Sequence, residues 1–271
     1  MGNLHLVGLA LICGLASACS DSKSDPGPPS EVPSPPGEGS TTPYVGPTGV
    51  FDVPNQTFEP IVTLLDNGEV YGIDVIDGRV AGFFHGPMSG TSSTVDSTNL
   101  TEYNALDGGL RQPATLSVTY TTPAVTTKLT FPFGTFTGSA RGQMTYAPDN
   151  SNTIYGSPVP LTMLAGSYHG ELSTVGTKMA IYSDAAGFTL QNDGHFAVAV
   201  NGCMFSGVIV SHAGKGVFDA TATVSGADCL IAGDLKGIAV PTLISPTSTI
   251  VAFEMLSQDA YTSVVLYLNK G

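Results

Sequence analysis

Short runs of alternating or β-branched residues, separated by turn-forming residues, fill the chain from Thr48 onward. The runs read PIVTLL, EVYGIDV, ATLSVTYTT, KLTFPF, KMAIYS, HFAVAV, CMFSGVIV, VFDATATV, STIVAFEM and TSVVLYL. The turn signals between them are Asp66-Asn67-Gly68, Asp77-Gly78, Asn192-Asp193-Gly194 and Gly214-Lys215-Gly216. Strands of this length at close spacing are typical of an antiparallel sandwich or barrel. We therefore predict an all-β fold.

Helix is almost absent from this pattern. The best short candidates are Thr98 to Leu106 and Leu161 to Leu164. Composition agrees with strands joined by tight turns, because the chain has 33 glycines and 19 prolines and only 11% of its residues are charged. Most of the body should therefore be sheet.

A degenerate internal repeat divides the body in two. The segment TGVF at 48–51 aligns with AGSY at 165–168, LLDNGEV at 64–70 with LQNDGHF at 190–196, and GFFHG at 82–86 with CMFSG at 203–207. The order agrees, although the spacings differ. We expect two similar small β-lobes at 48–155 and 163–271, with a hinge at Gly156-Ser157-Pro158-Val159-Pro160.

The first residues form an apolar run from Leu4 to Ala18 that ends directly before Cys19. The run is too short for a comfortable transmembrane helix, which needs roughly 20 residues. Small residues before a cysteine resemble the bacterial lipoprotein signal, in which the thiol is acylated and the preceding peptide bond is cut. The resemblance implies a signal peptide at 1–18, a lipid on Cys19 and, because Ser20 follows, the outer membrane. An ordinary secreted protein and an uncleaved anchor remain alternatives.

Residues 19–47 continue from the lipidated cysteine as a linker rich in proline, serine and glycine. The linker has almost nothing apolar to bury, so burial cannot offset the entropy lost on ordering it. We expect a disordered tether that spans between roughly 30 Å as a flexible chain and ~85 Å as polyproline II. The body would thus stand away from the bilayer.

Short glycine-dominated motifs recur in both halves of the body. They are AGSY at 165–168, LQNDGHF at 190–196 and GCMFSGV at 202–208. This pattern resembles a class of proteobacterial envelope lipoproteins, most of which have no assigned function. A more distant likeness is to two-lobed surface lipoproteins of the transferrin-binding protein B type. These resemblances imply a lipid-anchored envelope protein with a binding or structural role.

The charge balance narrows the range of partners. The chain carries 22 acidic and 9 basic residues, a net charge of −13. With no basic patch to collect phosphates, nucleic acid is excluded as a partner. The expected contacts are the membrane, through the lipid on Cys19, and a protein in the envelope or outside the cell. No residue pattern calls for a cofactor.

Cleavage and lipidation leave two of the four cysteines for pairing. Cys13 leaves with the signal peptide and Cys19 carries the lipid, so Cys203 and Cys229 remain. In an oxidising compartment this pair most simply forms a disulfide, which on the chain-entropy model contributes ~3.5 kcal/mol. Two buried free thiols are the alternative. The nearest histidines lack zinc-ligand spacing, so no metal site is predicted.

Catalytic signatures are missing from the sequence: there is no GxSxG, HExxH or GxxxxGK[ST] motif. His85, Ser89 and Asp96 allow a triad to be sketched, but adjacency in sequence is no evidence for a triad and a polar loop explains them better. We predict no catalytic residues and no enzymatic activity, with a hydrolase that lacks a recognisable motif as the third-ranked reading.

Four carboxylates cluster around one expected hairpin: Asp66, Glu69, Asp74 and Asp77. Paired carboxylates can hydrolyse glycosides across a cleft, but the chain has no tryptophan for sugar stacking. A solvated hairpin rim is the favoured explanation. A weak calcium site formed by Asp66, Asn67 and Asp77 is the main alternative.

Aromatic residues at strand positions suggest core packing more than a ligand cage. They are Phe83, Phe84, Phe131, Phe133, Phe136, Tyr168, Tyr182, Phe196, Phe205, Phe218, Tyr261 and Tyr267. An eight-stranded barrel can nevertheless hold one small apolar ligand, so a carrier is the second functional hypothesis. The first is a non-catalytic binding or envelope-structural role at the outer membrane.

Overall fold

In the computed structural model, the described part of the chain is almost entirely β. The described residues are 44, 48–52, 60–76, 79–91, 93–104, 110–121, 124–132, 134–139, 144–145, 155–175, 180–184, 187–227, 229, 231–245 and 248–271. Cys19, the signal peptide and nearly all of the linker lie outside them. Within these ranges, no helix is long and apolar enough to span a bilayer.

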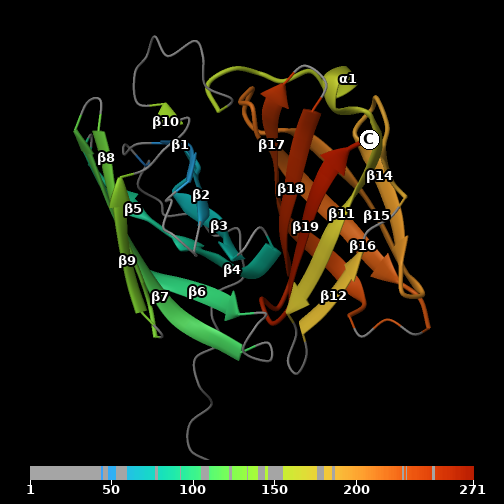
Figure 1. Ribbon diagram of the computed structural model, residues 1–271, viewed down its shortest axis with the longest axis horizontal. Coiled ribbons are helices and arrows are strands. Elements are labelled where there is room, and N and C mark those ends of the chain that lie inside the picture. Colours follow the sequence, from blue (N-terminus) through green and yellow to red (C-terminus); the bar gives the residue numbers. More distant parts are fainter. Residues whose placement is uncertain are drawn as a thin grey trace, which may run out of the picture. The chain divides into compact units, whose positions relative to one another are not determined.

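The first lobe is an open, antiparallel sheet of ten strands (Figure 1). Its strands, in order across the sheet, are β10 (Met144–Thr145), β1 (Thr48–Asp52), β2 (Ile61–Leu64), β3 (Glu69–Ile76), β4 (Arg79–Pro87), β6 (Thr94–Asn104), β7 (Leu110–Thr121), β8 (Ala124–Phe131) and β9 (Gly134–Ser139), with β5 (Ser89–Gly90) beside β6. Among the described strands, β9 and β10 form the two edges, so the sheet does not close.

The second lobe is a closed barrel. Its strands are β12 (Ala180–Asp184), β11 (Gly166–Val175), β13 (Phe188–Leu190), β14 (His195–Val200), β15 (Cys203–Ser211), β16 (Phe218–Ser225), β17 (Gly233–Ser245), β18 (Ser248–Ser257) and β19 (Ser263–Lys270). Closure comes from β11, which pairs with β13 on one side and with β19 on the other. The one described helix, α1 (Leu161–Leu164), lies directly before β11 and confirms the second helix candidate.

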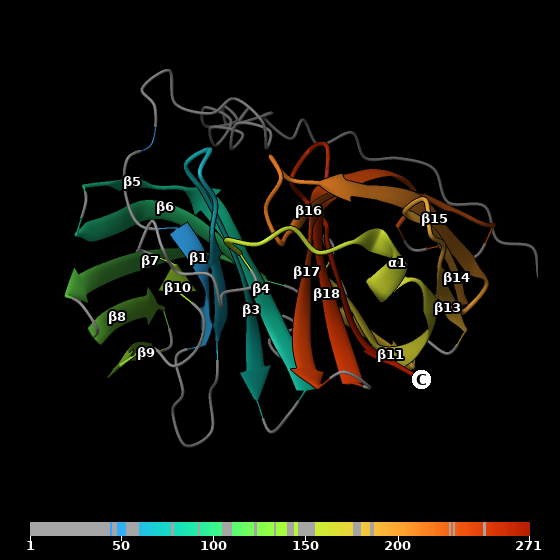
Figure 2. The same cartoon turned by 90° about the horizontal axis from the view of Figure 1, so that it is seen from above.

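The two lobes, which Figures 1 and 2 show side by side, are built from the same succession of antiparallel strands. In the first lobe Gly49 pairs with Leu64, and in the barrel Gly166 pairs with Leu190. The following turns are also alike, because Gly68 and Gly194 adopt φ angles of 86° and 89°, which favour glycine. The predicted pair of similar lobes is therefore confirmed, with one lobe closed and the other open.

The first helix candidate, Thr98 to Leu106, is wrong. Its described residues continue strand β6, which pairs with β7 on one side and with β4 and β5 on the other. A register shift between Ser97 and Leu100 keeps Val95 and Leu100 on the inner face of the sheet, while Tyr103 is buried on the outer face. This irregularity interrupts the alternation of buried and exposed residues along the strand, so the sequence pattern does not predict a strand here.

Three apolar clusters form the core. The first fills the barrel from the inner faces of its strands, and β16 shows the expected strict alternation of buried and exposed residues. The second covers the inner face of the first lobe, with Phe51, Phe84 and Leu116 among its members. The third joins outward-facing residues of both sheets, including Phe83 and Tyr103 from one and Ile238 and Val265 from the other. We call this third cluster the interlobe layer.

Candidate functional site

His212 holds the two lobes together at the edge of the interlobe layer. It follows β15 and is buried, with its Nε2 2.9 Å from Oδ1 of Asp66 and its Nδ1 2.6 Å from Oδ1 of Asp219. Asp66 belongs to the turn between β2 and β3 of the first lobe, whereas Asp219 lies on β16 of the barrel. The imidazole thus contacts a carboxylate that lies 146 positions away in the sequence and in the other lobe.

This geometry requires a charged imidazole. A neutral histidine has a single N–H, whereas both ring nitrogens of His212 face carboxylate oxygens that can only accept. The hydrogen bond to Asp219 is the largest influence, and together with Asp66 it outweighs burial and raises the pKa of His212 to about 8. At neutral pH the arrangement is therefore one cation between two anions.

Tyr155 ties the connection between the lobes to the same place. Its hydroxyl accepts a hydrogen bond from the Asp66 backbone N–H at 3.1 Å, and its carbonyl accepts one from Gly216 N at 3.0 Å. The ammonium of Lys215 lies 5.7 Å from the centre of the tyrosine ring. The predicted hinge at residues 156–160 thus begins at a residue anchored to both lobes.

A second contact between a histidine and a carboxylate lies on the first lobe beside the layer. His85 Nε2 is 3.7 Å from Glu69 Oε1, and the His85 ring stacks at a tilt on Tyr71 with centroids 4.4 Å apart. Burial raises the pKa of Glu69, but hydrogen bonding by His85 and Asn67 and the charges of His85 and His212 outweigh it, so the net pKa is lowered. We refer to Asp66, Glu69, His85, Tyr155, His212 and Asp219 as the junction cluster.

Glu254 introduces an acid into the interlobe layer itself. On β18, Ala252 and Leu256 belong to this layer and flank Glu254 on the same face. Its side chain is fully buried, and neither carboxylate oxygen has a hydrogen-bond partner among the described residues. Burial raises its pKa to about 8, so the group is neutral when the lobes are packed at neutral pH.

The sketched triad does not form. Ser89 Oγ donates to the backbone carbonyl of Asp96 at 3.3 Å, and the Asp96 carboxylate accepts from Ser117 at 2.8 Å. His85 instead contacts Glu69. His85, Ser89 and Asp96 therefore contact different groups and do not form a hydrogen-bonded chain, which fits a structural role for each.

The solvated-rim interpretation of the hairpin carboxylates is wrong for Asp74. Its carboxylate is 2% exposed and faces the inside of the first lobe, because the strand pairing places it opposite Gly82. Asp66 contacts His212, and Glu69 contacts His85. Asp77 lies outside the described residues. Within the described part of the chain, no three His, Cys, Asp or Glu side chains gather as a metal centre.

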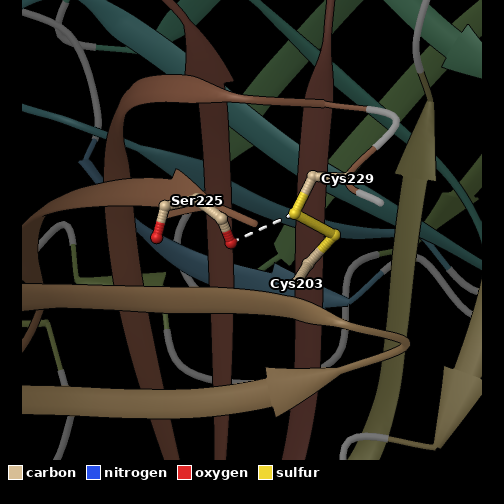
Figure 3. Close-up of a disulfide and its surroundings, with 3 residues drawn as sticks. All are labelled: Cys203, Ser225 and Cys229. Carbon is tan, nitrogen blue, oxygen red and sulfur yellow. Dashed lines mark hydrogen bonds between the residues drawn. A yellow bond between two sulfur atoms is a disulfide. The ribbon is translucent and has the colours of Figure 1, made fainter. Parts of the chain in front are cut away.

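Cys203 and Cys229 are joined as a disulfide, with Cα atoms 5.2 Å apart (Figure 3). The bond connects the start of β15 to the segment between β16 and β17, and the Cys229 sulfur also lies 3.1 Å from the carbonyl oxygen of Ser225. Gly226 permits this approach, because a Cβ there would lie 2.5 Å from Gly202 O and 2.9 Å from the Cys229 sulfur. The bridge braces one end of the barrel.

Aromatic side chains fill the barrel, as the sequence predicts for a core. Tyr168, Phe188, Phe196 and Phe253 are buried and in mutual ring contact, with centroid distances from 4.9 to 5.8 Å. The Tyr168 hydroxyl donates to the carbonyl of Leu164. Phe133 lies outside the described residues, and the side chain of Tyr182 does too.

The outer face of β14–β17 carries a shallow groove. Ser206, Val208, Thr221, Thr223 and Lys236 line its walls, among others. Met204 and Val210, which are 44% and 53% exposed, lie on the same outward face of β15. This face combines hydroxyl groups with apolar side chains.

No pattern in the sequence predicts the junction cluster or the burial of Glu254. The sequence spacing of His212 argues against a zinc site and gives no other signal. Its partners, Asp66 and Asp219, lie in a distant turn and on a neighbouring strand. Glu254 did leave one signal, as the single acid within the apolar run STIVAFEML. Its burial depends on packing between lobes, which no local pattern contains.

No family model matches the chain, and no curated protein sequence is significantly similar to it. Among solved structures, it is similar to a crystal structure of a protein of unknown function from the DUF3598 family of Nostoc punctiforme PCC 73102, with 7% sequence identity and a TM-score of 0.27. The match covers 84% of this chain and 96% of the other. A likeness of this strength carries no argument about function.

Stability should fall as pH rises through the range in which His212 loses its proton. The folded pKa of about 8 lies above the ordinary value of 6.5, so the stabilisation is complete below pH 6.5 and is lost as pH passes 8. We expect His212→Gln to destabilise more at about pH 6 than at about pH 9, by on the order of 1 kcal/mol after allowing for the exposure of both aspartates.

Urea unfolding of both proteins across this pH range measures the effect. His195→Gln is the matched control, because His195 also contacts an aspartate, Asp193, but its side chain is 63% exposed. A destabilisation by His212→Gln that is the same at every pH would contradict the charged bridge.

Proposed function

We propose that this protein is a lipid-anchored component of the bacterial outer membrane with a non-catalytic binding or envelope-structural role. The apolar run that ends at Cys19 and the proline-rich linker support the anchor. The body is a pair of β-lobes braced by the interlobe layer, the junction cluster and a disulfide. Such a body suits a fixed surface presented at the end of a tether.

One observation carries the choice of binding over transport: side chains occupy the barrel interior. The buried core contributed by its strands includes Leu172, Phe188, Phe205, Phe253 and Leu266. An apolar ligand inside the barrel would have to displace several of these groups, each of which contributes roughly 1.5–3 kcal/mol by its burial. The filled interior weighs against the carrier hypothesis and directs binding to the outside.

The outer face of β14–β17 is the surface we assign to a protein partner. Its groove offers hydroxyl groups of Ser206, Thr221 and Thr223 beside the partly exposed Val208 and the exposed Met204. Mixed polar and apolar surfaces of this kind are typical of non-obligate protein contacts. The separate engagement of His85, Ser89 and Asp96 supports a role without catalysis.

The lipid anchor predicts that Cys19→Ala abolishes incorporation of labelled palmitate and releases the protein from the membrane fraction. The acyl chain attaches to the thiol, so its loss removes the anchor while leaving the body folded. Cys13→Ala is the control and should still be labelled. Continued labelling of Cys19→Ala would overturn the assignment.

The filled barrel predicts that the exported chain carries no organic ligand. Native mass spectrometry of the Cys19→Ala chain, purified from a periplasm, should give the mass of the polypeptide with its disulfide and no added organic molecule. A reproducible extra mass larger than that of a metal ion, lost on unfolding, would favour the carrier over the outer-face binding role.

A further inference from the structure

The inner face of the first lobe changes from apolar to acidic along its strands. Asp74 on β3 lies opposite Gly82 on β4, which lies opposite Asn104 on β6. In the next row, Glu102 lies between Phe84 on β4 and Gln112 on β7. Residues opposite one another share a face, so the four oxygen-bearing side chains lie on the same face as the apolar cluster that contains Phe84.

Asp74 is the least satisfied group in this set. It is 2% exposed, and within the described part of the chain neither of its carboxylate oxygens has a hydrogen-bond partner. Its Oδ2 lies only 2.9 Å from the position that a Cβ on Gly82 would occupy, so the carboxylate leans over the glycine toward β6. Glycine is needed there because any side chain would collide with the acid.

A second buried acid faces the same space. Glu102 is 1% exposed, and Asn104 donates to its Oε1 at 3.3 Å. Burial is the main cause that raises the pKa of Asp74 well above its ordinary value, and the charge of Glu102 adds to it. A buried carboxylate without a hydrogen-bond partner costs several kcal/mol, so Asp74 needs either a proton or a cation.

The donor set identifies the cation by its chemistry. Carboxylate and amide oxygens are the only side-chain donors that Asp74, Glu102, Asn104 and Gln112 provide, with no imidazole or thiolate among them. Hard cations prefer such ligands, and Ca²⁺ tolerates the irregular six- to eight-oxygen arrangements that Mg²⁺ does not. Two carboxylates also balance the charge of one divalent ion.

We propose that Asp74 and Glu102 bind one calcium ion inside the first lobe, with the amide oxygens of Asn104 and Gln112 as further ligands. The ion would replace the missing partners of Asp74 and join β3 to β6 and β7 across Gly82. This differs from a site in the turn at Asp66, whose carboxylate already contacts His212. The binding site is independent of the proposed partner surface on the barrel.

Thermal unfolding of the full-length protein, in detergent and freed of metal by a chelator, tests the site. About 5 mM calcium chloride should raise the melting temperature by at least about 2 °C if the affinity is that of extracellular calcium modules. Asp74→Asn should remove this shift. Glu254→Gln should keep it, because Glu254 is equally buried but lies in the interlobe layer, away from the inner face of the first lobe.

Equilibrium dialysis with radioactive calcium on the unmodified protein gives a readout that does not depend on a variant folding. One bound ion per chain, lost in Glu102→Gln and kept in Asp66→Asn, supports the site. No bound calcium, or binding that Asp66→Asn abolishes and Glu102→Gln does not, overturns it. An Asp74→Asn protein that is more stable at every calcium concentration, together with absent binding, would show that the two acids share protons instead.

Discussion

The interlobe layer is the constraint on which the rest of the structure depends. The first lobe is an open sheet, and an open sheet with apolar side chains on both faces must cover both. Its inner face has its own cluster, but its outer face, with Tyr71, Phe83 and Tyr103, is buried against barrel residues. The Tyr103 hydroxyl reaches across to the carbonyl of Ala260 at 2.7 Å. The closed barrel therefore supplies the surface that the open lobe lacks.

Charge is placed around this layer so that packing is favoured in acidic rather than alkaline solution. His212 is held as a cation between Asp66 and Asp219 at its edge, while Glu254 is neutral within it. Both groups have pKa values raised to about 8 in the folded protein, so the stability that each contributes declines as pH rises from its ordinary pKa, 6.5 for His212 and 4.5 for Glu254, to about 8. The acids Asp74 and Glu102 lie on the opposite face of the same sheet, where a cation can balance them.

Local chemistry made the strands and turns predictable, since Asn67-Gly68 and Asp193-Gly194 carry the signals of tight turns. The repeat was visible for the same reason, because glycines at equivalent positions meet equivalent backbone demands. Prediction failed where long-range packing decides. Thr98 to Asn104 is strand because β4 and β7 flank it, and Asp74 is buried because Gly82 leaves space beside it. His212 gains its role from a turn in the other lobe.

Cooperativity of unfolding is the most direct test of the claim that the two lobes form one body. Differential scanning calorimetry of the full-length protein, with its disulfide intact, should show a single transition whose calorimetric and van't Hoff enthalpies agree, because losing the barrel exposes the outer face of the first lobe. Two separated transitions, with one lobe melting while the other stays folded, would contradict it.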